Sequence, residues 1–472
     1  MQAGNSSAMH SDLSCRCPHG VFDPAVFFAA EAAFGRRAFL TGVLALGGAL
    51  ALRPLRALAA DTDVVVIRAA RLFDGTRMHS PGLVVIKGTQ IVSLNAGDAP
   101  SGATVIDLGD ATIMPGLIDA HTHVAASVVN SSYLMQGRRG AADSVAEAAL
   151  NSTRNAAEML ANGFTTVRDV GGSNGIDLAI RNAIARGAIA GPRMLASGPA
   201  LSITGGHGDA NDVPTFVDVH SEIESGISFG PYGFRQKVRE HVKRHVDLIK
   251  ITSTGGVLSY GDAFDVPQFN LDEIQALVDE AHKFGLKVAA HCHGDPGIAM
   301  AVEGGVDSIE HGTGVESATL AKMKQRGTYL VPTIWAGDSI LQPGNPNHIP
   351  PGSLAKAQQA ARLGKAGMLR AVPSGVKIAY GTDAGVFPHK ENNKDFALLQ
   401  AMGMRPMDLL ASATSVAADL LGTPDRGRIA PGLLADVVAF AGDPSTDTRL
   451  LETAPKLIVQ GGKRVDRTRL IG

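Results

Sequence analysis

The chain has 472 residues, of which 45% are hydrophobic, and its formal net charge is −2. This composition excludes a disordered chain, and the nearly neutral balance indicates no basic surface for nucleic acid. The 55 glycines and only 5% aromatic residues fit a fold with many tight turns.

The first sixty residues have the features of an export signal. Arg36 and Arg37 precede an apolar run over residues 38–52, and an A-x-A motif follows at 57–59. The paired arginines resemble a twin-arginine signal, and the run is short for a membrane span. We therefore predict a signal peptide over residues 1–60, a periplasmic or secreted mature protein, and no stable membrane anchor after cleavage. The alternatives are an ordinary secretory signal or an uncleaved anchor.

Residues 61–112 are predicted to form strands. Short runs rich in valine and isoleucine cover residues 64–67, 83–86 and 90–94, and Lys87-Gly88-Thr89 is typical of a hairpin turn. This segment is expected to be the first part of a small β-domain.

Residues 113–424 have a different sequence pattern, in which short apolar runs alternate with amphipathic segments. Eight strands that alternate with helices predict a parallel (β/α)8 TIM barrel, an α/β fold. The expected strands cover residues 113–121, 164–169, 193–197, 246–251, 286–291, 306–311, 328–333 and 376–382. The expected helices include residues 144–162, 177–186, 271–284 and 318–326.

Residues 425–472 return to a strand-like pattern, with apolar runs at 434–440 and 457–463. The simplest arrangement joins this segment to residues 61–112 in one β-sandwich domain built from both chain ends. The barrel would then be inserted between its two parts.

Metal-binding residue types end several of the predicted barrel strands, and these ends meet at the catalytic face of such a barrel. The residues are His121, His123, Lys250, His291, His311 and Asp383. One histidine near a strand is more often a hydrogen-bonded structural residue, and one aspartate is often a helix cap. A lysine between two isoleucines is costly to bury without a partner. Because all six fall on one face, a metal site explains them better than six separate roles.

These residues and the motifs around them resemble the amidohydrolase superfamily. The matching segments are Pro115 to His123, Lys250, His291, His311, Gly381-Thr382-Asp383, and residues 427–438 near the end of the chain. The segment from Lys250 to Asp262 resembles the branch of prolidase-like and Xaa-Arg/Lys dipeptidases, which includes ochratoxin-hydrolysing amidohydrolases.

The resemblance implies two divalent metal ions, for which zinc is the expected element, roughly 3.5–4 Å apart. His121, His123 and Asp383 would hold one ion, and His291 and His311 the other. Lys250, carboxylated on its side-chain nitrogen, would bridge them. A metal-bridging hydroxide would be the nucleophile, and Asp383 is the expected general base.

Four further positions are candidates for the substrate pocket. Tyr260 is a candidate catalytic and substrate-binding residue, expected by resemblance to contact the carbonyl oxygen or the substrate carboxylate. The alternative is a packed aromatic in a glycine-rich loop. His207 is a pocket residue or a solvated loop histidine, and His293 orients substrate or caps a turn. Arg168 could recognise a carboxylate or form an internal pair with Asp169. The segment over residues 335–352 is expected to be a lid or an oligomer contact.

The predicted function is hydrolysis of the amide or peptide bond to a C-terminal amino acid. Substrates would be dipeptides or N-acyl amino acids, including ochratoxin A, which would give ochratoxin alpha and phenylalanine. One alternative is a cyclic amide hydrolase similar to imidazolonepropionase, which uses one metal, and Lys250 speaks against it. Another is a non-catalytic scaffold, which the complete ligand set disfavours. The resemblance also suggests a homo-oligomer, for which an octamer is one candidate assembly, and no nucleic acid partner is expected.

Overall fold

The computed structural model describes residues 64–95, 100–125, 144–209, 211, 226–259, 261–343 and 351–471. Residues Thr62–Gly472 form one compact unit. The predicted signal peptide and Tyr260 lie outside the described residues. Within the described residues, no helix has both the length and the hydrophobicity needed to cross a bilayer.

The two chain ends build two β-sheets that share one apolar core. The first sheet has the strand order β5-β4-β1-β6, and the second has the order β19-β18-β17-β7-β2-β3. Buried side chains such as Ile67 and Val84 from the first sheet cluster with Leu72, Ile113 and Val437 from the second. This shared cluster supports the predicted β-sandwich, which stays a prediction. The strands are β1 (Val64–Ala69), β2 (Arg71–Phe73), β3 (Met78–His79), β4 (Gly82–Lys87), β5 (Gln90–Leu94), β6 (Thr104–Asp107), β7 (Ala111–Pro115), β17 (Val437–Ala441), β18 (Leu457–Gln460) and β19 (Lys463–Arg464).

The predicted hairpin is confirmed, because β4 and β5 pair antiparallel across Gly88. Gly88 has a φ of +58°, which a residue without a Cβ adopts at little cost.

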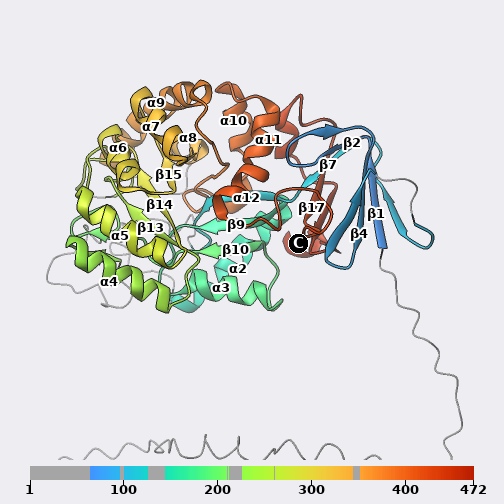
Figure 1. Ribbon diagram of the computed structural model, residues 1–472, viewed down its shortest axis with the longest axis horizontal. Coiled ribbons are helices and arrows are strands. Elements are labelled where there is room, and N and C mark those ends of the chain that lie inside the picture. The colour runs from blue at the N-terminus through green and yellow to red at the C-terminus, as the bar shows by residue number, and fades with distance from the viewer. Residues whose placement is uncertain are drawn as a thin grey trace, which may run out of the picture. The chain divides into compact units, whose positions relative to one another are not determined.

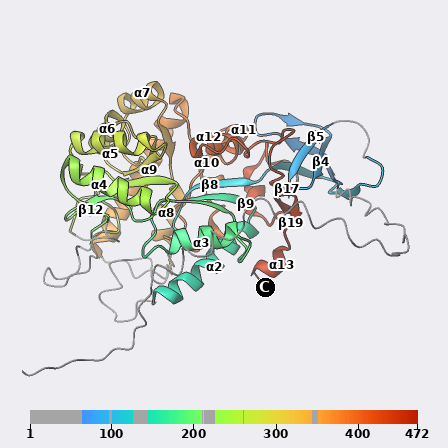
Figure 2. The ribbon, with the colours of Figure 1, turned by 60° about the horizontal axis from the view of Figure 1, so that its bottom comes forward.

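Between the chain ends, short parallel strands alternate with helices in a TIM-barrel-like α/β arrangement. Figure 1 shows helices around the strands β9, β13 and β14, and both Figure 1 and Figure 2 show the β-rich part at one side. The strands are β8 (Leu117–Thr122), β9 (Phe164–Asp169), β10 (Arg193–Ala196), β11 (Ser202–Ile203), β12 (Ile227–Ser228), β13 (Leu248–Thr252), β14 (Lys287–Cys292), β15 (Ser308–His311) and β16 (Tyr329–Val331).

The helices agree closely with the four that the sequence predicts. A capping box at Ser144 and Glu147 starts α2, and a second one at Asn270 and Glu273 starts α5. The helices are α2 (Val145–Ala161), α3 (Ile176–Ala185), α4 (Gly230–Lys243), α5 (Leu271–Lys283), α6 (Asp295–Gly304), α7 (Ser317–Arg326), α8 (Ile334–Ile340), α9 (Pro351–Ser374), α10 (Asp395–Ala401), α11 (Pro406–Ser412), α12 (Ser415–Leu421) and α13 (Arg467–Ile471), with 3-10 turns η2 (His389–Glu391) and η3 (Thr448–Glu452).

The predicted eighth strand is not a regular strand, although its backbone is bonded on both sides. The Ala379 N–H donates to Leu330 O of β16 at 2.9 Å, and the Ala120 N–H of β8 donates to Tyr380 O at 2.9 Å. These bonds place residues 378–384 between β16 and β8, where the eighth strand is expected. The segment predicted as a lid over residues 335–352 is partly helical, because α8 extends to Ile340 and α9 starts at Pro351.

The predicted strand over residues 113–121 was wrong, because it is two strands. β7 pairs with β17 and β2 in the β-rich part, whereas β8 pairs with β9 in the barrel. The chain changes sheets at Gly116, where a Cβ would lie 2.0 Å from Thr165 Oγ1. Only glycine allows β9 to approach this closely. The first strand of the barrel-like part, β8, begins at Leu117.

We expect Gly116→Ala to lower the free energy of unfolding by about 1–3 kcal/mol, because the new methyl group would overlap the buried Thr165 side chain. Denaturant unfolding, followed by fluorescence of Trp335, the only tryptophan, measures this change. The control is Gly337→Ala in α8, where a Cβ meets nothing within 4 Å. This control should gain up to about 1 kcal/mol from higher helix propensity. Equal stability of the two variants would contradict the account of Gly116.

Candidate metal centre and active site

The structure brings five of the six predicted ligands into two groups, and both groups lie at the carboxyl ends of the parallel strands. His121, His123 and Asp383 form one group, and His291, His293 and His311 form the other; within each group the ligand atoms lie within 4.8 Å of one another. Rings of the two groups are also in contact, since the His121 and His311 centroids are 5.0 Å apart. The two groups therefore belong to one centre.

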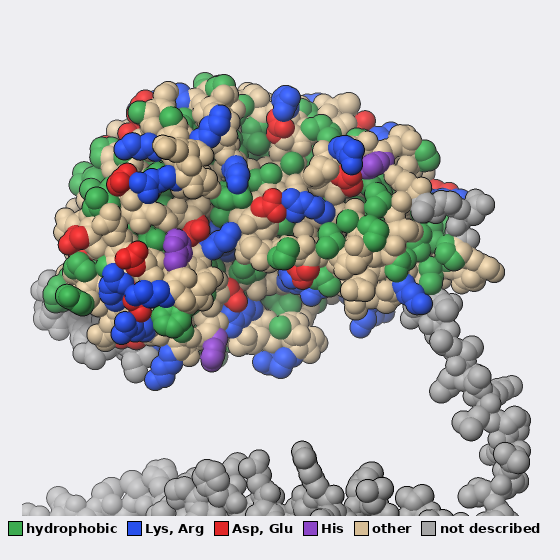
Figure 3. Space-filling model, viewed as in Figure 1, with side chains coloured by type: hydrophobic (Ala, Val, Ile, Leu, Met, Phe, Trp, Pro, Cys, Tyr) green, Lys and Arg blue, Asp and Glu red, His purple; other side chains and the backbone are tan. Residues whose placement is uncertain are grey.

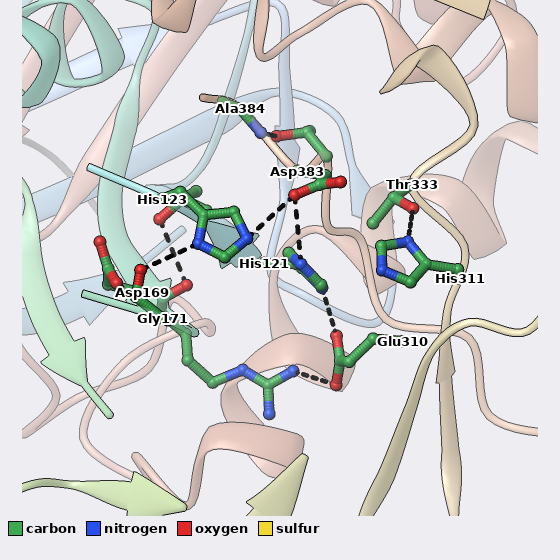
Figure 4. Close-up of polar contacts among 12 residues, drawn as sticks. His121, His123, Asp169, Gly171, Glu310, His311, Thr333, Asp383 and Ala384 are labelled. Atoms are coloured by element: carbon green, nitrogen blue, oxygen red, sulfur yellow. Dashed lines mark hydrogen bonds and ion pairs between the residues drawn. The ribbon is translucent and has the colours of Figure 1, made fainter. Parts of the chain in front are cut away.

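Asp383 stands between the two histidines of the first group. Its Oδ1 lies 3.1 Å from His123 Nε2 and 3.4 Å from His121 Nε2 (Figure 4). Among the described residues, His121 Nε2 has no partner with hydrogen-bond geometry, although it is fully buried. Burial would raise the pKa of Asp383, but His121 and His123 hold it well below its usual range. An ionised carboxylate and an unsatisfied imidazole nitrogen fit the first metal position.

The outer nitrogen of each of four histidines is already engaged. His123 Nδ1 lies 3.1 Å from Gly171 O, and His291 Nε2 lies 3.2 Å from Gly255 O. His311 Nδ1 and His293 Nδ1 each meet a threonine hydroxyl, at 2.6 and 2.7 Å. Such outer contacts orient an imidazole and leave its other nitrogen for a metal. The residues present therefore fit the two metal ions that the sequence predicts.

The second group is held neutral. Burial lowers the pKa of His291 and of His311 well below the ordinary value, and the neighbouring imidazoles and Lys250 act in the same direction. Because a metal binds the neutral imidazole, these histidines can act as ligands without first losing a proton at neutral pH.

Lys250 lies in β13 and is 3% exposed, and its charge acts on members of both ligand groups, such as His123 and His291. Burial lowers the pKa of its amine to about 8, while Glu310 and Asp383 oppose this shift. A lowered pKa leaves a larger neutral fraction of the amine at neutral pH, and the neutral amine is the form that can be carboxylated. The structure therefore supports the predicted carboxylation of Lys250, which stays a prediction.

The sequence analysis did not identify Glu310, which contacts the ring nitrogen of His121 that faces away from Asp383. Glu310 Oε2 lies 2.7 Å from His121 Nδ1, and its Oε1 accepts from Arg168 Nη2 at 2.8 Å. Burial would raise the pKa of Glu310, but Arg168 and His121 lower it to about 2. The signal in the sequence was a charged residue inside a buried strand, one position before a predicted ligand.

Arg168 therefore forms an internal ion pair, but with Glu310 instead of the expected Asp169. Its side chain is 2% exposed and also donates to Ala120 O at 2.5 Å and to Ser308 Oγ at 3.2 Å. Asp169 instead accepts from the Val124 N–H at 2.6 Å. With its donors engaged inside the barrel, Arg168 is not placed to recognise a substrate carboxylate.

Two of the predicted substrate residues, His207 and His293, lie at the second ligand group. The His207 ring stacks on His291 with centroids 4.2 Å apart, and its Nδ1 has no hydrogen-bond partner among the described residues. The His293 ring lies 4.9 Å from His311, and His293 joins the ligand group instead of standing apart from it. His207 and His293 thus line the centre, and their roles toward substrate stay predictions.

Comparison with known proteins identifies the family. The amidohydrolase family model matches residues 112–465. The chain belongs to the amidohydrolase family. It is 30% identical to ochratoxinase from Aspergillus niger over 436 residues, which cover 87% of this chain and 88% of that protein. Imidazolonepropionase from Deinococcus deserti is 24% identical over 401 residues, covering 79% and 89%.

Solved structures agree with this family. The crystal structure of a Xaa-Pro dipeptidase with methionine in its active site matches with a TM-score of 0.79 and 36% identity, covering 86% of this chain and 100% of that one. The protein is thus an amide or peptide hydrolase in the prolidase-like and ochratoxinase branch of its superfamily, and metal dependence is typical of the family.

On the face of the molecule shown in Figure 3, acidic and basic side chains are interspersed. No extended basic patch is seen on this face.

We expect Glu310→Gln to weaken zinc binding about 10–100-fold, because the neutral amide holds His121 less firmly and makes it a weaker ligand. Metal content after dialysis against graded chelator measures the effect. The control is Glu303→Gln, whose carboxylate pairs with Arg326 at the surface. Unchanged zinc affinity in a folded Glu310→Gln protein would show that Glu310 does not support the metal ligand.

Proposed function

We propose that this protein is a binuclear metal-dependent hydrolase that releases the C-terminal amino acid from dipeptides and N-acyl amino acids. The observation that carries the proposal is the pair of ligand groups, His121–His123–Asp383 and His291–His293–His311, at one end of the parallel strands. Two such groups in contact suit a two-metal site. The Xaa-Pro dipeptidase and ochratoxinase relatives support this substrate class.

His121, His123 and Asp383 would hold one ion, and His291 and His311 the other, with a carboxylated Lys250 between them. Zinc is the proposed metal, because imidazole, carboxylate and carbamate are suitable ligands for it. When bound, the ions supply an activated water at neutral pH and polarise the scissile carbonyl. His293 lies with His291 and His311, so it could bind either the second ion or the substrate.

Asp383 is the proposed general base. Its low pKa keeps it ionised at neutral pH, so that it is ready to accept a proton. It would take the proton of the attacking water and deliver it to the leaving amine nitrogen. Its backbone φ of +65° is unusual for a residue other than glycine, which indicates that the surrounding structure holds the carboxylate in place.

His207 is the proposed contact to the substrate. Burial lowers its pKa to about 4, so the ring is neutral at pH 7 and offers one donor and one acceptor. Its Nδ1 is buried against Gly256, so the other ring nitrogen, Nε2, is the one that we propose to meet an incoming carboxylate or carbonyl. Tyr260 stays a second proposed substrate contact from the sequence.

Ochratoxin A has the same bond geometry as an N-acyl amino acid, and we propose it as one substrate, cleaved to ochratoxin alpha and phenylalanine. The similarity to ochratoxinase supports this choice. The rival function is hydrolysis of a cyclic amide, which the weaker likeness to imidazolonepropionase favours. The buried Lys250 argues for the binuclear enzyme. Export and assembly into a homo-oligomer stay predictions.

Liquid chromatography of ochratoxin A, N-acyl-phenylalanine, Xaa-Pro and Xaa-Arg substrates tests the proposed reaction. We expect the zinc-loaded protein to release the C-terminal amino acid from at least one of them, and a chelator to abolish the release. Asp383→Asn should lower kcat by roughly 10²–10⁴-fold, because the amide cannot accept the proton.

The control for that substitution is Asp408→Asn, which changes an exposed carboxylate paired with Arg405 and should retain full activity. The proposed function fails if the metal-loaded protein cleaves none of these substrates.

Metal stoichiometry separates the binuclear enzyme from the cyclic amide hydrolase. We expect about two ions per chain in the native protein and about one in Lys250→Met, because the variant lacks the bridging ligand. Lys377→Met is the control, since Lys377 is an exposed lysine beside Tyr329. About one ion per chain in the native protein would instead support the imidazolonepropionase-like alternative.

A further inference from the structure

Lys356 of α9 reaches across to the loop that follows β13. Its ammonium donates to Gly256 O and Ser259 O, each at 2.7 Å, and lies 3.2 Å from Asp262 Oδ1 and 3.3 Å from Asp262 O. The ammonium is thus surrounded by backbone carbonyls and one carboxylate. Four acceptors around three N–H groups leave no donor for a substrate carboxylate.

Asp262 extends this contact within the loop. Its Oδ1 accepts from Ser259 Oγ at 2.6 Å, and its Oδ2 accepts from the Gly256 N–H at 3.0 Å. Gln268 then donates to Asp262 Oδ2 at 3.2 Å and accepts from the His207 N–H at 2.9 Å. A continuous series of polar contacts therefore runs from Lys356 to the backbone of His207.

The same loop packs against the metal-site histidines. Gly255 O accepts from His291 Nε2, and Gly256 lies so close to His207 that a Cβ would be 2.0 Å from its Nδ1. A shift of this backbone would therefore move His207 and loosen its stacking on His291. The position of the loop decides how His207 faces the centre.

We propose that Lys356 is a positioning residue that fixes the loop after β13, and through it His207, at the substrate side of the metal centre. Lys356 acts through the loop and does not touch substrate. The effect on catalysis rests on the function proposed above, whereas the effect on the loop does not. Loss of the ammonium should loosen substrate binding more than it slows the chemical step.

Lys356→Ala tests the proposal, because propylammonium has the three carbons and the nitrogen that the substitution removes. We expect KM to rise roughly tenfold, with kcat changed less than about threefold and metal content unchanged. Added propylammonium should restore KM. Lys365→Ala is the matched control on the same helix, since Lys365 pairs with Asp338 and is 51% exposed.

Hydrogen exchange gives a readout that needs no substrate. The Gly256 N–H, which is bonded to Asp262, should exchange about tenfold faster in Lys356→Ala and slow again with propylammonium. If Lys356→Ala does not fold, Lys356→Met keeps the apolar stem and tests the same loss of charge. Two results would overturn the proposal. One is a Gly256 N–H that exchanges no faster in Lys356→Ala than in Lys365→Ala. The other is a faster exchange or a higher KM in Lys356→Ala that added propylammonium does not reverse. If the native protein cleaves no substrate, the proposed function fails. The exchange rate of the Gly256 N–H still tests whether Lys356 holds the loop, because that measurement needs no substrate.

Discussion

The buried ion pair between Arg168 and Glu310 is the interaction on which the centre depends. It joins β9 to β15, and Glu310 continues to His121 of β8. Both charges are almost completely buried, so removing one partner would leave the other uncompensated, at a cost of about 3–5 kcal/mol. The contacts of Arg168, Glu310 and His121 thus connect β9, β15 and β8 close to the metal ligands at the ends of these strands. Through Glu310, the ion pair also holds the His121 ring in place.

The backbone conformation and the outer hydrogen bonds hold the ligands above this pair in place. His311 and Asp383 have φ angles of +69° and +65°, and Thr333, which contacts His311, has +48°. Each such conformation costs roughly 1–2 kcal/mol for a residue other than glycine. The outer hydrogen bonds of the histidines turn their free nitrogens inward. A metal site built this way gives up some backbone energy for fixed ligand directions.

Around this shared centre, the loops carry what distinguishes one amide substrate from another. The second ligand group is bordered by His207, whose position depends on the loop after β13 and, in our proposal, on Lys356 of α9. A helix that follows β16 in the chain would then influence a pocket built on β13 and β14. In this proposal, the strands position the metal ligands, whereas a helix distant in the chain positions His207.

The sequence by itself determined the alternation of strands and helices, and most of the strand ends at which the ligands stand, because apolar periodicity and residue type are local properties. It placed His121, His123, His291, His311 and Asp383 correctly at one face. It could not show that Gly116 divides one apolar run between two sheets, since the division appears only in the pairing of the strands and in the approach of Thr165. The partners of Arg168 and Lys356 were equally hidden, because they lie about 140 and 100 residues away in the chain. Contacts of this range are decided by how the strands pack, and only the tertiary structure brings those side chains together.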